Sequence, residues 1–248
     1  MLDASGTPIR SFKLRARAGL NRVPWDLRYE AAPQVVLRTV APDNPHIFAD
    51  PRFSGHSTRP VLHWGIEATV RTGPIAAPGK YSVRLTVAGK SWTQPYAVLR
   101  APAMPSPTTD LIASTQTQLR IRNDMTDAVN MIPRIALISP PIADQRAANA
   151  GNADVVAALD RLNDKMLGVE LQLLTRSDME SDDKYYVEQF KVYMNLVWLS
   201  GEVGSGAGDV AGGADYRPTS QSLEVLNGIE QALAAARTSY ARLIGTEV

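Results

Sequence analysis

The sequence predicts two domains of different class, an all-β sandwich followed by an all-α antiparallel helical bundle. The chain has 248 residues, more than a single hydrophobic core usually organises. Residues 1–107 carry 14 Lys and Arg against 6 Asp and Glu, whereas residues 108–248 carry 12 against 19. Thirteen of the 17 prolines also lie before residue 108. This change in composition predicts a β domain over 1–100, a Pro-rich linker over 101–107 and a bundle over 108–248.

Alternating apolar and polar residues predict the strands of the first half. Residues 9–17 alternate with period two after a one-residue slip, and residues 19–29 place Val23, Trp25 and Leu27 on one face. Short strands separated by Pro and Gly are typical of a small sandwich. Residues 31–75 are less regular and predict a long loop insertion.

The clearest strand is residues 81–87, followed by a hairpin. Its odd-numbered residues share one apolar face: Tyr81, Val83, Leu85 and Val87. A tight turn at 88–90 then leads to a return strand over 91–98. Pro95 lacks an N–H group, which places this return strand at the edge of a sheet or at an irregularity.

Apolar residues at helical spacing predict the first two helices of the second half. The first covers about 108–132, and Pro133 is expected to kink or end it. The second is capped by Asn152 and continues to Leu173. Their expected core residues are Gln118, Ile121, Met125, Ala128 and Ile132, then Val155, Leu159, Leu162, Met166, Val169 and Leu173.

Two further helices complete the predicted bundle. The third is expected to begin near Ser181, with Asp182 and Asp183 in its first turn, where carboxylates favour the positive end of the helix. The fourth is expected to begin at Pro218–Thr219. Their expected core residues are Val187, Phe190, Met194 and Val197, then Leu226, Ile229, Leu233, Ala236, Tyr240 and Leu243.

Several motifs resemble a known family. Gly19-Leu-Asn-Arg-Val-Pro-Trp-Asp26 and Ala77-Pro-Gly-Lys-Tyr-Ser-Val-Arg-Leu85 resemble the immunoglobulin-like module of flagellar hook-capping proteins. The same pattern occurs after the β-propeller of bacterial sortilin-type, sialidase-repeat proteins that carry a glycosyl hydrolase-like label. Residues 182–186 and 204–213 extend that second resemblance into the helical half. It implies an immunoglobulin-like sandwich, a β-propeller partner and a periplasmic or extracellular location.

Composition excludes several other classes of protein. The chain has no cysteine, which removes disulfides and thiolate chemistry. No apolar run reaches the length of a membrane span, and the first residues lack the pattern of a signal peptide. The basic excess is dispersed along strands without interleaved aromatic residues, so no nucleic-acid partner is expected. It suits docking on the acidic helical half or on a propeller.

The residues that could bind a ligand are few. The glycines of 204–213 are expected to form a structural connector, and Asp209 and Asp215 are the candidate metal ligands if that loop binds a cation. The spacing of His46, His56 and His63 matches no local metal pattern, so no cofactor is expected. Trp64 and Trp92 are the candidate carbohydrate-binding residues, and the alternative for tryptophans on alternating strands is core packing.

Catalysis by this chain is not expected. Glycoside hydrolysis needs two carboxyl groups facing each other across a cleft, whereas Asp182 and Asp183 are adjacent and suit helix capping. The resemblance places any active site in a propeller outside these residues. The sequence therefore predicts a non-catalytic accessory region that supports or caps a β-propeller and mediates interdomain or protein contacts. The alternatives are a carbohydrate-binding module, part of a secreted sialidase-like hydrolase, or a hydrolase using Asp209 or Asp215.

Overall fold

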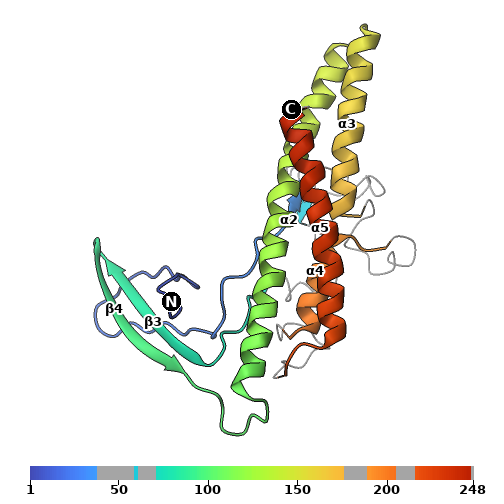
Figure 1. Ribbon diagram of the computed structural model, residues 1–248. Coiled ribbons are helices and arrows are strands. Elements are labelled where there is room, and N and C mark those ends of the chain that lie inside the picture. Colours follow the sequence, from blue (N-terminus) through green and yellow to red (C-terminus); the bar gives the residue numbers. More distant parts are fainter. Residues whose placement is uncertain (38–58, 61–70, 176–188, 205–215, 247–248) are drawn as a thin grey trace, which may run out of the picture.

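A long helical bundle with a β arm projecting from its side makes up the fold (Figure 1). This is a computed structural model, and it describes residues 1–37, 59–60, 71–175, 189–204 and 216–246. Its described part is mixed α/β and 53% helical, with four helices and two two-stranded antiparallel sheets. The predicted fold, an all-β immunoglobulin-like sandwich followed by an all-α antiparallel bundle, is therefore wrong: the described residues form no sandwich, and their helices belong to a mixed α/β structure.

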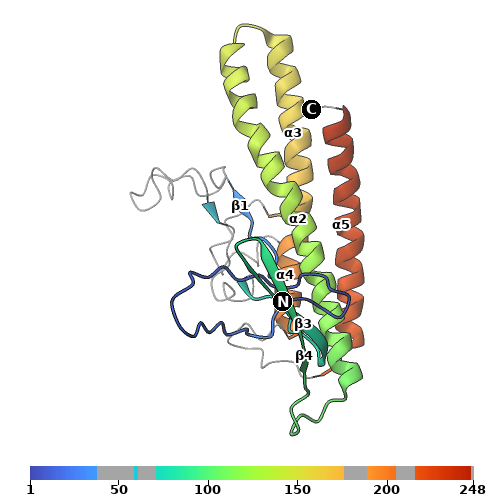
Figure 2. The same cartoon turned by 90° about the vertical axis from the view of Figure 1, so that its left-hand side faces the viewer.

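Four helices build the bundle. They are α2 (Thr108–Ala148), α3 (Ala153–Leu173), α4 (Val192–Glu202) and α5 (Ser220–Thr246). Helices α2 and α5 lie side by side and run in the same direction, while α3 returns along the upper part of α2 (Figures 1 and 2). Helix α4 packs on α2 and α5 lower down.

Helix α2 is longer than the sequence predicts. It continues for 41 residues through Pro133, which was expected to kink or end it near Ile132. Proline removes one backbone hydrogen bond and costs about 3 kcal/mol inside a helix. Ile132, Ile135 and Ala136 flank the proline and are each 0% exposed, and their burial against the neighbouring helices offsets that cost.

The bundle core has two connected parts. The larger joins α2, α4 and α5 and contains the predicted residues Ile121, Met125, Leu226 and Leu233. The smaller, higher up, joins α2, α3 and α5 through Ile135, Met166, Val169 and Leu243. Most of the predicted stripe residues are buried, because helical spacing places them on one face of each helix.

The helix starts agree with the sequence in three cases, the first being α2 at Thr108, and differ in one. The side chain of Asn152 accepts a hydrogen bond from the N–H of Val155 at 3.3 Å, so the predicted cap of α3 is confirmed. Helix α5 begins at Ser220, next to the predicted start. Helix α4 begins at Val192, so Phe190 precedes it, and the expected first turn around Asp182 lies outside the described residues.

The predicted hairpin is present. Strand β3 (Gly79–Val87) pairs with β4 (Lys90–Val98), and β1 (Val36–Leu37) forms a separate short pair with β2 (Arg59–Pro60). Ala88 and Gly89 have φ angles of 49° and 79°, as the tight primed turns that join twisted strands require. Pro95 lies opposite Ser82 in β4, an edge strand, as its missing N–H predicted.

No second sheet packs on this hairpin in the part of the chain that the structure describes. Residues 9–17 and 19–29 were expected to be strands, yet they form no strand and hold one isolated bridge, from Arg28 to Ile75. Val83, Leu85 and Val87 were expected to face a core and are instead 40%, 56% and 50% exposed. The hairpin is a two-stranded ribbon with an uncovered apolar face.

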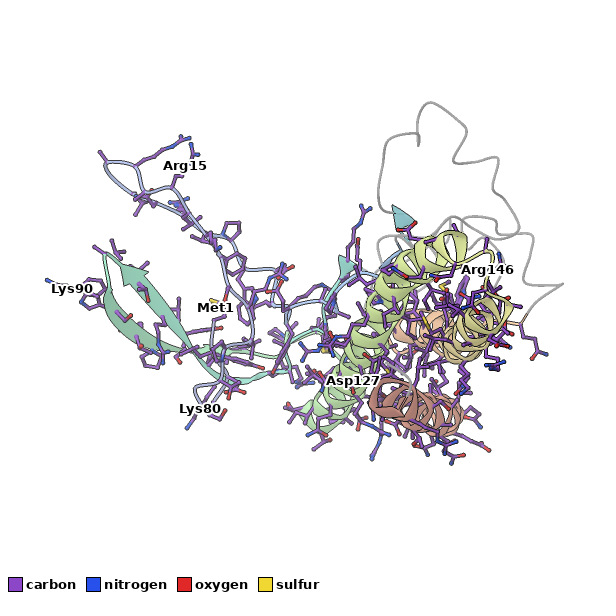
Figure 3. All side chains as sticks on the ribbon, turned by 90° about the horizontal axis from the view of Figure 1, so that it is seen from above. Met1, Arg15, Lys80, Lys90, Asp127 and Arg146 are labelled. Carbon is purple, nitrogen blue, oxygen red and sulfur yellow. The ribbon has the colours of Figure 1, made fainter. Side chains whose placement is uncertain are left out.

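The base of the arm is fastened to α2. Ile9, Ala76 and Tyr81 form a small core there, with Trp25 and Tyr96 packed against it. Ile75 donates its N–H to Gln118 at 3.2 Å and accepts a hydrogen bond from the hydroxyl of Thr115 at 2.9 Å. The arm, defined here as residues 1–30 and 75–100, is thus anchored at one end and free along its length (Figure 3).

Candidate functional site: an apolar groove in the arm

An apolar groove of about 780 Å³ follows strand β3. Strand β3 forms one side, from Val83 to Val87, and the extended segment 10–16 forms the other. Figure 3 shows the two sides diverging from Met1 toward Arg15 and toward Lys90. The volume lies within the range of pockets that hold ligands.

The groove is apolar because the apolar residues of two alternating segments line it from opposite sides. Leu85 and Val87 line it from the hairpin, and Phe12 and Leu14 line it from the opposite segment. Trp25 and Tyr96 close its inner end, with ring centroids 5.9 Å apart in an edge-to-face arrangement. Water contacts most of this surface, so covering it would gain roughly 25 cal/mol per Å² of buried apolar area.

On both sides of the groove, backbone hydrogen-bonding groups have no backbone partner in the part of the chain that the structure describes. Leu2 exchanges two backbone hydrogen bonds with Ser82, at 2.8 and 3.0 Å, which shows that Ser82 directs its N–H and C=O away from β4. Backbone groups of successive residues in a strand point to opposite edges. The N–H and C=O groups of Arg84 and Thr86 therefore point, like those of Ser82, to the edge of β3 that faces away from β4. Residues 11–16 likewise make no backbone–backbone hydrogen bond with any described residue.

The arm is strongly basic around this groove. Its ten Lys and Arg residues outnumber its three acidic residues. The acidic residues already have partners: Asp3 holds a turn through Ser5 and Thr7, and Asp26 and Glu30 pair with Arg10 at 4.0 and 3.2 Å. Lys13, Arg15, Arg17, Arg22, Arg84 and Lys90 have no carboxylate partner among the described residues.

The expected docking of these basic residues on the acidic helical half is not seen among the described residues. The ion pairs between described residues each lie within one half, as Arg120–Glu230 and Arg146–Asp160 do in the bundle. The positive charge of the arm therefore faces solvent beside the groove.

Trp92, a predicted carbohydrate-binding residue, lies on the apolar face of the hairpin. It is opposite Leu85 in the strand register and 57% exposed, so it extends the apolar surface beyond the groove. Trp64, Asp209, Asp215 and the three histidines lie outside the described residues. Among the described residues, no three His, Asp or Glu side chains gather closely enough to hold a metal ion.

The sequence predicts which residues share the apolar faces of the groove, but it does not predict that these faces stay open. Phe12, Leu14, Val83 and Leu85 were each expected to face a core, because period-two alternation is the usual sign of a buried strand face. Alternation identifies the residues that share a face and cannot show whether another element covers it. The available signal was the excess of unpaired basic residues around the same strands.

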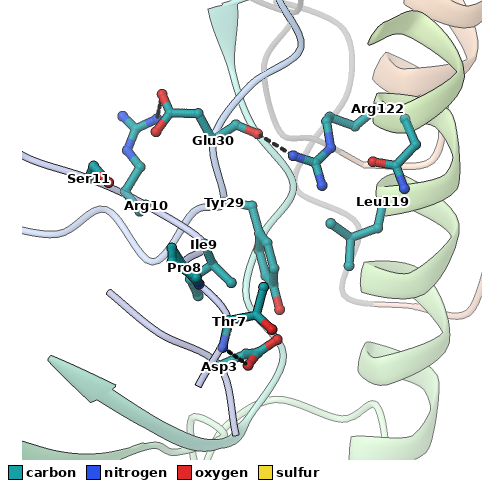
Figure 4. Close-up of a pocket in the computed structure, with 11 residues that line it drawn as sticks. Asp3, Thr7, Pro8, Ile9, Arg10, Ser11, Tyr29, Glu30, Leu119 and Arg122 are labelled. Carbon is teal, nitrogen blue, oxygen red and sulfur yellow. Dashed lines mark hydrogen bonds and ion pairs between the residues drawn. The ribbon is translucent and has the colours of Figure 1, made fainter. Parts of the chain in front are cut away.

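A second hollow, of about 430 Å³, lies where the arm meets α2 (Figure 4). Arg122 reaches from α2 and donates to the carbonyl oxygen of Glu30 at 3.4 Å, while the carboxylate of Glu30 pairs with Arg10. Burial lowers the pKa of Arg122, and the Ser5 hydroxyl lowers the pKa of Asp3 by hydrogen bonding to its carboxylate. Both carboxylates that line this hollow already have partners, so it is a polar joint between arm and bundle.

One carboxyl group in the bundle has an altered environment. Asp124 faces α5, where burial and the nearby Glu230 raise its pKa to about 6 although Arg237 lies 3.7 Å away. Its Oδ2 atom is buried without a hydrogen-bond partner among the described residues. Asp124 belongs to the seam between α2 and α5 and not to either hollow.

Comparisons with known proteins do not add a family. No family model, no curated protein and no solved structure matches the chain. No helix among the described residues combines the length and apolar character that a membrane crossing requires.

Proposed function

We propose that this chain is a non-catalytic accessory module that docks on another protein through its β arm. The observation that carries the proposal is the groove: apolar side chains, unpaired backbone groups and uncompensated basic residues lie together on one exposed element. Covering the apolar side chains with a protein surface is favourable. Covering the backbone groups and basic side chains is favourable where the partner supplies hydrogen bonds and carboxylates. The bundle anchors the base of the arm through the hydrogen bonds of Ile75 with Gln118 and Thr115.

The motifs at 19–26 and 77–85 suggest the partner. They resemble the region that follows the propeller in sortilin-type, sialidase-repeat proteins, so the proposed partner is a β-propeller of that type in a periplasmic or extracellular setting. In this proposal the chain supports the propeller, and the chemistry of the parent protein resides there.

The test begins with the genomic sequence before the codon for Met1, which we expect to encode propeller repeats. The propeller would then be co-expressed with the 248-residue chain and the mixture analysed by size-exclusion chromatography. We expect a complex that Leu85→Arg abolishes. Leu137→Arg is the matched control, because Leu137 is 46% exposed on α2, outside the arm. A complex that tolerates Leu85→Arg would contradict docking through the arm.

A glycoside assay tests the non-catalytic part of the proposal. The purified chain is expected to show no turnover of sialosides or other glycosides. Turnover that disappears in Asp209→Asn or Asp215→Asn would show instead that the chain is itself a hydrolase.

The exposed Trp92 favours carbohydrate binding as a second candidate function, because an indole ring on an open strand face can stack against a sugar. Glycan-array binding that is lost in Trp92→Ala and retained in Trp198→Ala would support it. Trp198 is a suitable control because it is 42% exposed on α4, away from the arm.

A further inference from the structure

We infer that the groove of the arm binds an extended protein segment in which apolar and acidic residues alternate, and that this segment adds a strand to the free edge of β3. The inference rests on the proposed function and specifies what the arm binds. Its three supports are the backbone edge, the alternation of the two faces and the charge around them.

The backbone edge selects an extended occupant. Beyond Ser82, the N–H and C=O groups of Arg84 and Thr86 continue the edge that Leu2 begins, and residues 11–16 present further unpaired backbone groups opposite them. A strand lying between the two sides would hydrogen-bond to β3 and extend the pairing already started by Leu2. Addition of a strand to an exposed edge is an established mode of peptide recognition. A helix satisfies its own backbone groups and would leave this edge unpaired.

The two faces of β3 select the side chains of that strand. One face carries Val83, Leu85 and Val87, and the opposite face carries Arg84 and Thr86. Directly opposed side chains on neighbouring strands favour apolar pairs and pairs of opposite charge. Residues 83–87 extend over roughly 17 Å, so about five residues of the occupant would pair with them.

The charge of the arm makes a second copy of this chain a poor occupant. Edge-to-edge pairing of two copies through β3 would bring Arg84 of both copies close together, with no described carboxylate to compensate them. Like charges on adjacent strands destabilise pairing. An acidic segment of another protein instead gains from each unpaired basic residue.

The experiment uses the full chain and a fluorescein-labelled peptide, Val-Glu-Ile-Asp-Val-Glu-Ile, with fluorescence anisotropy as the readout. We expect saturable binding that weakens as salt increases, because screening reduces the attraction between acidic peptide and basic arm. A peptide of the same composition in scrambled order, and one with Lys in place of Glu and Asp, are expected to bind at least tenfold more weakly.

Backbone pairing is tested on the peptide, which leaves the fold of the protein unchanged. N-methylation of alternate amides removes donors from one edge of the peptide only. Two peptides are compared, one methylated on its odd-numbered amides and one on its even-numbered amides. We expect one of them to bind at least tenfold more weakly than the unmethylated peptide, and the other to bind about threefold more weakly or less. Equal losses in both peptides would overturn strand addition.

Two protein variants test the side-chain preferences. Leu85→Arg is expected to weaken binding at least tenfold, with Leu137→Arg as the exposed-leucine control and circular dichroism as the check on folding. Arg84→Glu is expected to reduce the preference for the acidic peptide over the Lys peptide at least tenfold, although the remaining basic residues of the arm still favour the acidic one. An unchanged preference would overturn the assignment of acidic residues to that face.

The remaining outcomes separate this inference from the proposed function. If the propeller binds through Leu85 while no extended peptide binds, the inference fails and the proposed function stands. If neither binds, both fail. A Leu85-dependent dimer in analytical ultracentrifugation would identify a second copy as the occupant, and binding to phosphatidylserine vesicles without peptide binding would identify a membrane surface. Either result overturns the inference.

Discussion

Leu226 in α5 and Leu85 in β3 belong to equally regular apolar stripes, yet Leu226 is 0% exposed and Leu85 is 56% exposed. The bundle supplies three other helices to cover its stripes, whereas no described element covers the hairpin. The difference shows that periodicity defines a face and that the number of neighbouring elements decides whether the face becomes a core. It also supports the proposed docking of the arm, because an uncovered apolar face on a folded chain is a candidate surface for another molecule.

The largest expected effect comes from truncating the same residue type in both regions. Leu226→Ala removes a fully buried side chain and should lower the free energy of unfolding by about 2–5 kcal/mol. Leu85→Ala should change it by less than about 0.5 kcal/mol, since Leu85 already contacts water. Urea unfolding followed by circular dichroism measures both. Equal losses would mean that the arm's apolar face is buried in solution.

The joint between the regions gives the next effect. Gln118→Leu removes the acceptor for the N–H of Ile75 and leaves that group without its partner, which should cost about 1–3 kcal/mol. We expect faster amide exchange at Ile75 and Ala76 while exchange of α5 amides stays unchanged. Gln172→Leu, in α3 and far from the arm, is the matched control. Equal exchange rates in both variants would show that this contact does not anchor the arm.

Asp124 provides a test of pH dependence in the bundle. Its pKa in the folded chain is about 6, above the ordinary value of 3.8, so the folded state binds the proton more tightly than the unfolded state. This contribution to stability is complete below pH 3.8 and is lost as the pH rises through about 6. Asp124→Asn should therefore exceed the native chain in stability by roughly 1 kcal/mol near pH 8, after allowance for solvent screening, and differ little near pH 4.

Urea unfolding of both proteins at the two pH values measures this difference. Asp127→Asn is the control, because it removes a neighbouring carboxylate of α2 that pairs with Arg237. A difference between Asp124→Asn and the native chain that is the same at both pH values would contradict a proton-linked effect.

The smallest expected effect is confined to the hairpin turn. Ala88 has a φ of 49°, a left-handed conformation that glycine adopts without steric cost. Ala88→Gly should stabilise the hairpin by about 0.5–1 kcal/mol. Hydrogen exchange of the β3 and β4 amides should slow several-fold, whereas global unfolding of the bundle should not shift. A shift in global unfolding would show that arm and bundle unfold together.

Local patterns predicted the elements whose determinants lie within them. The hairpin depends on alternation around a turn at Gly89, and α3 depends on the cap at Asn152, so both could be located from sequence. The passage of α2 through Pro133 could not, because it depends on burial of Ile132 and Ile135 against residues distant in the chain. The groove could not be located either, since it arises where residues 10–16 meet strand β3.

The sequence by itself determined which residues share a face, where the charge divides and where most helices begin. Those features follow from backbone geometry and composition, which act over a few residues. Only the tertiary structure decided that the stripe of α5 is enclosed while the alternating face of β3 stays open. Burial depends on elements that approach from elsewhere in the chain, and the described residues supply them to the bundle but not to the arm.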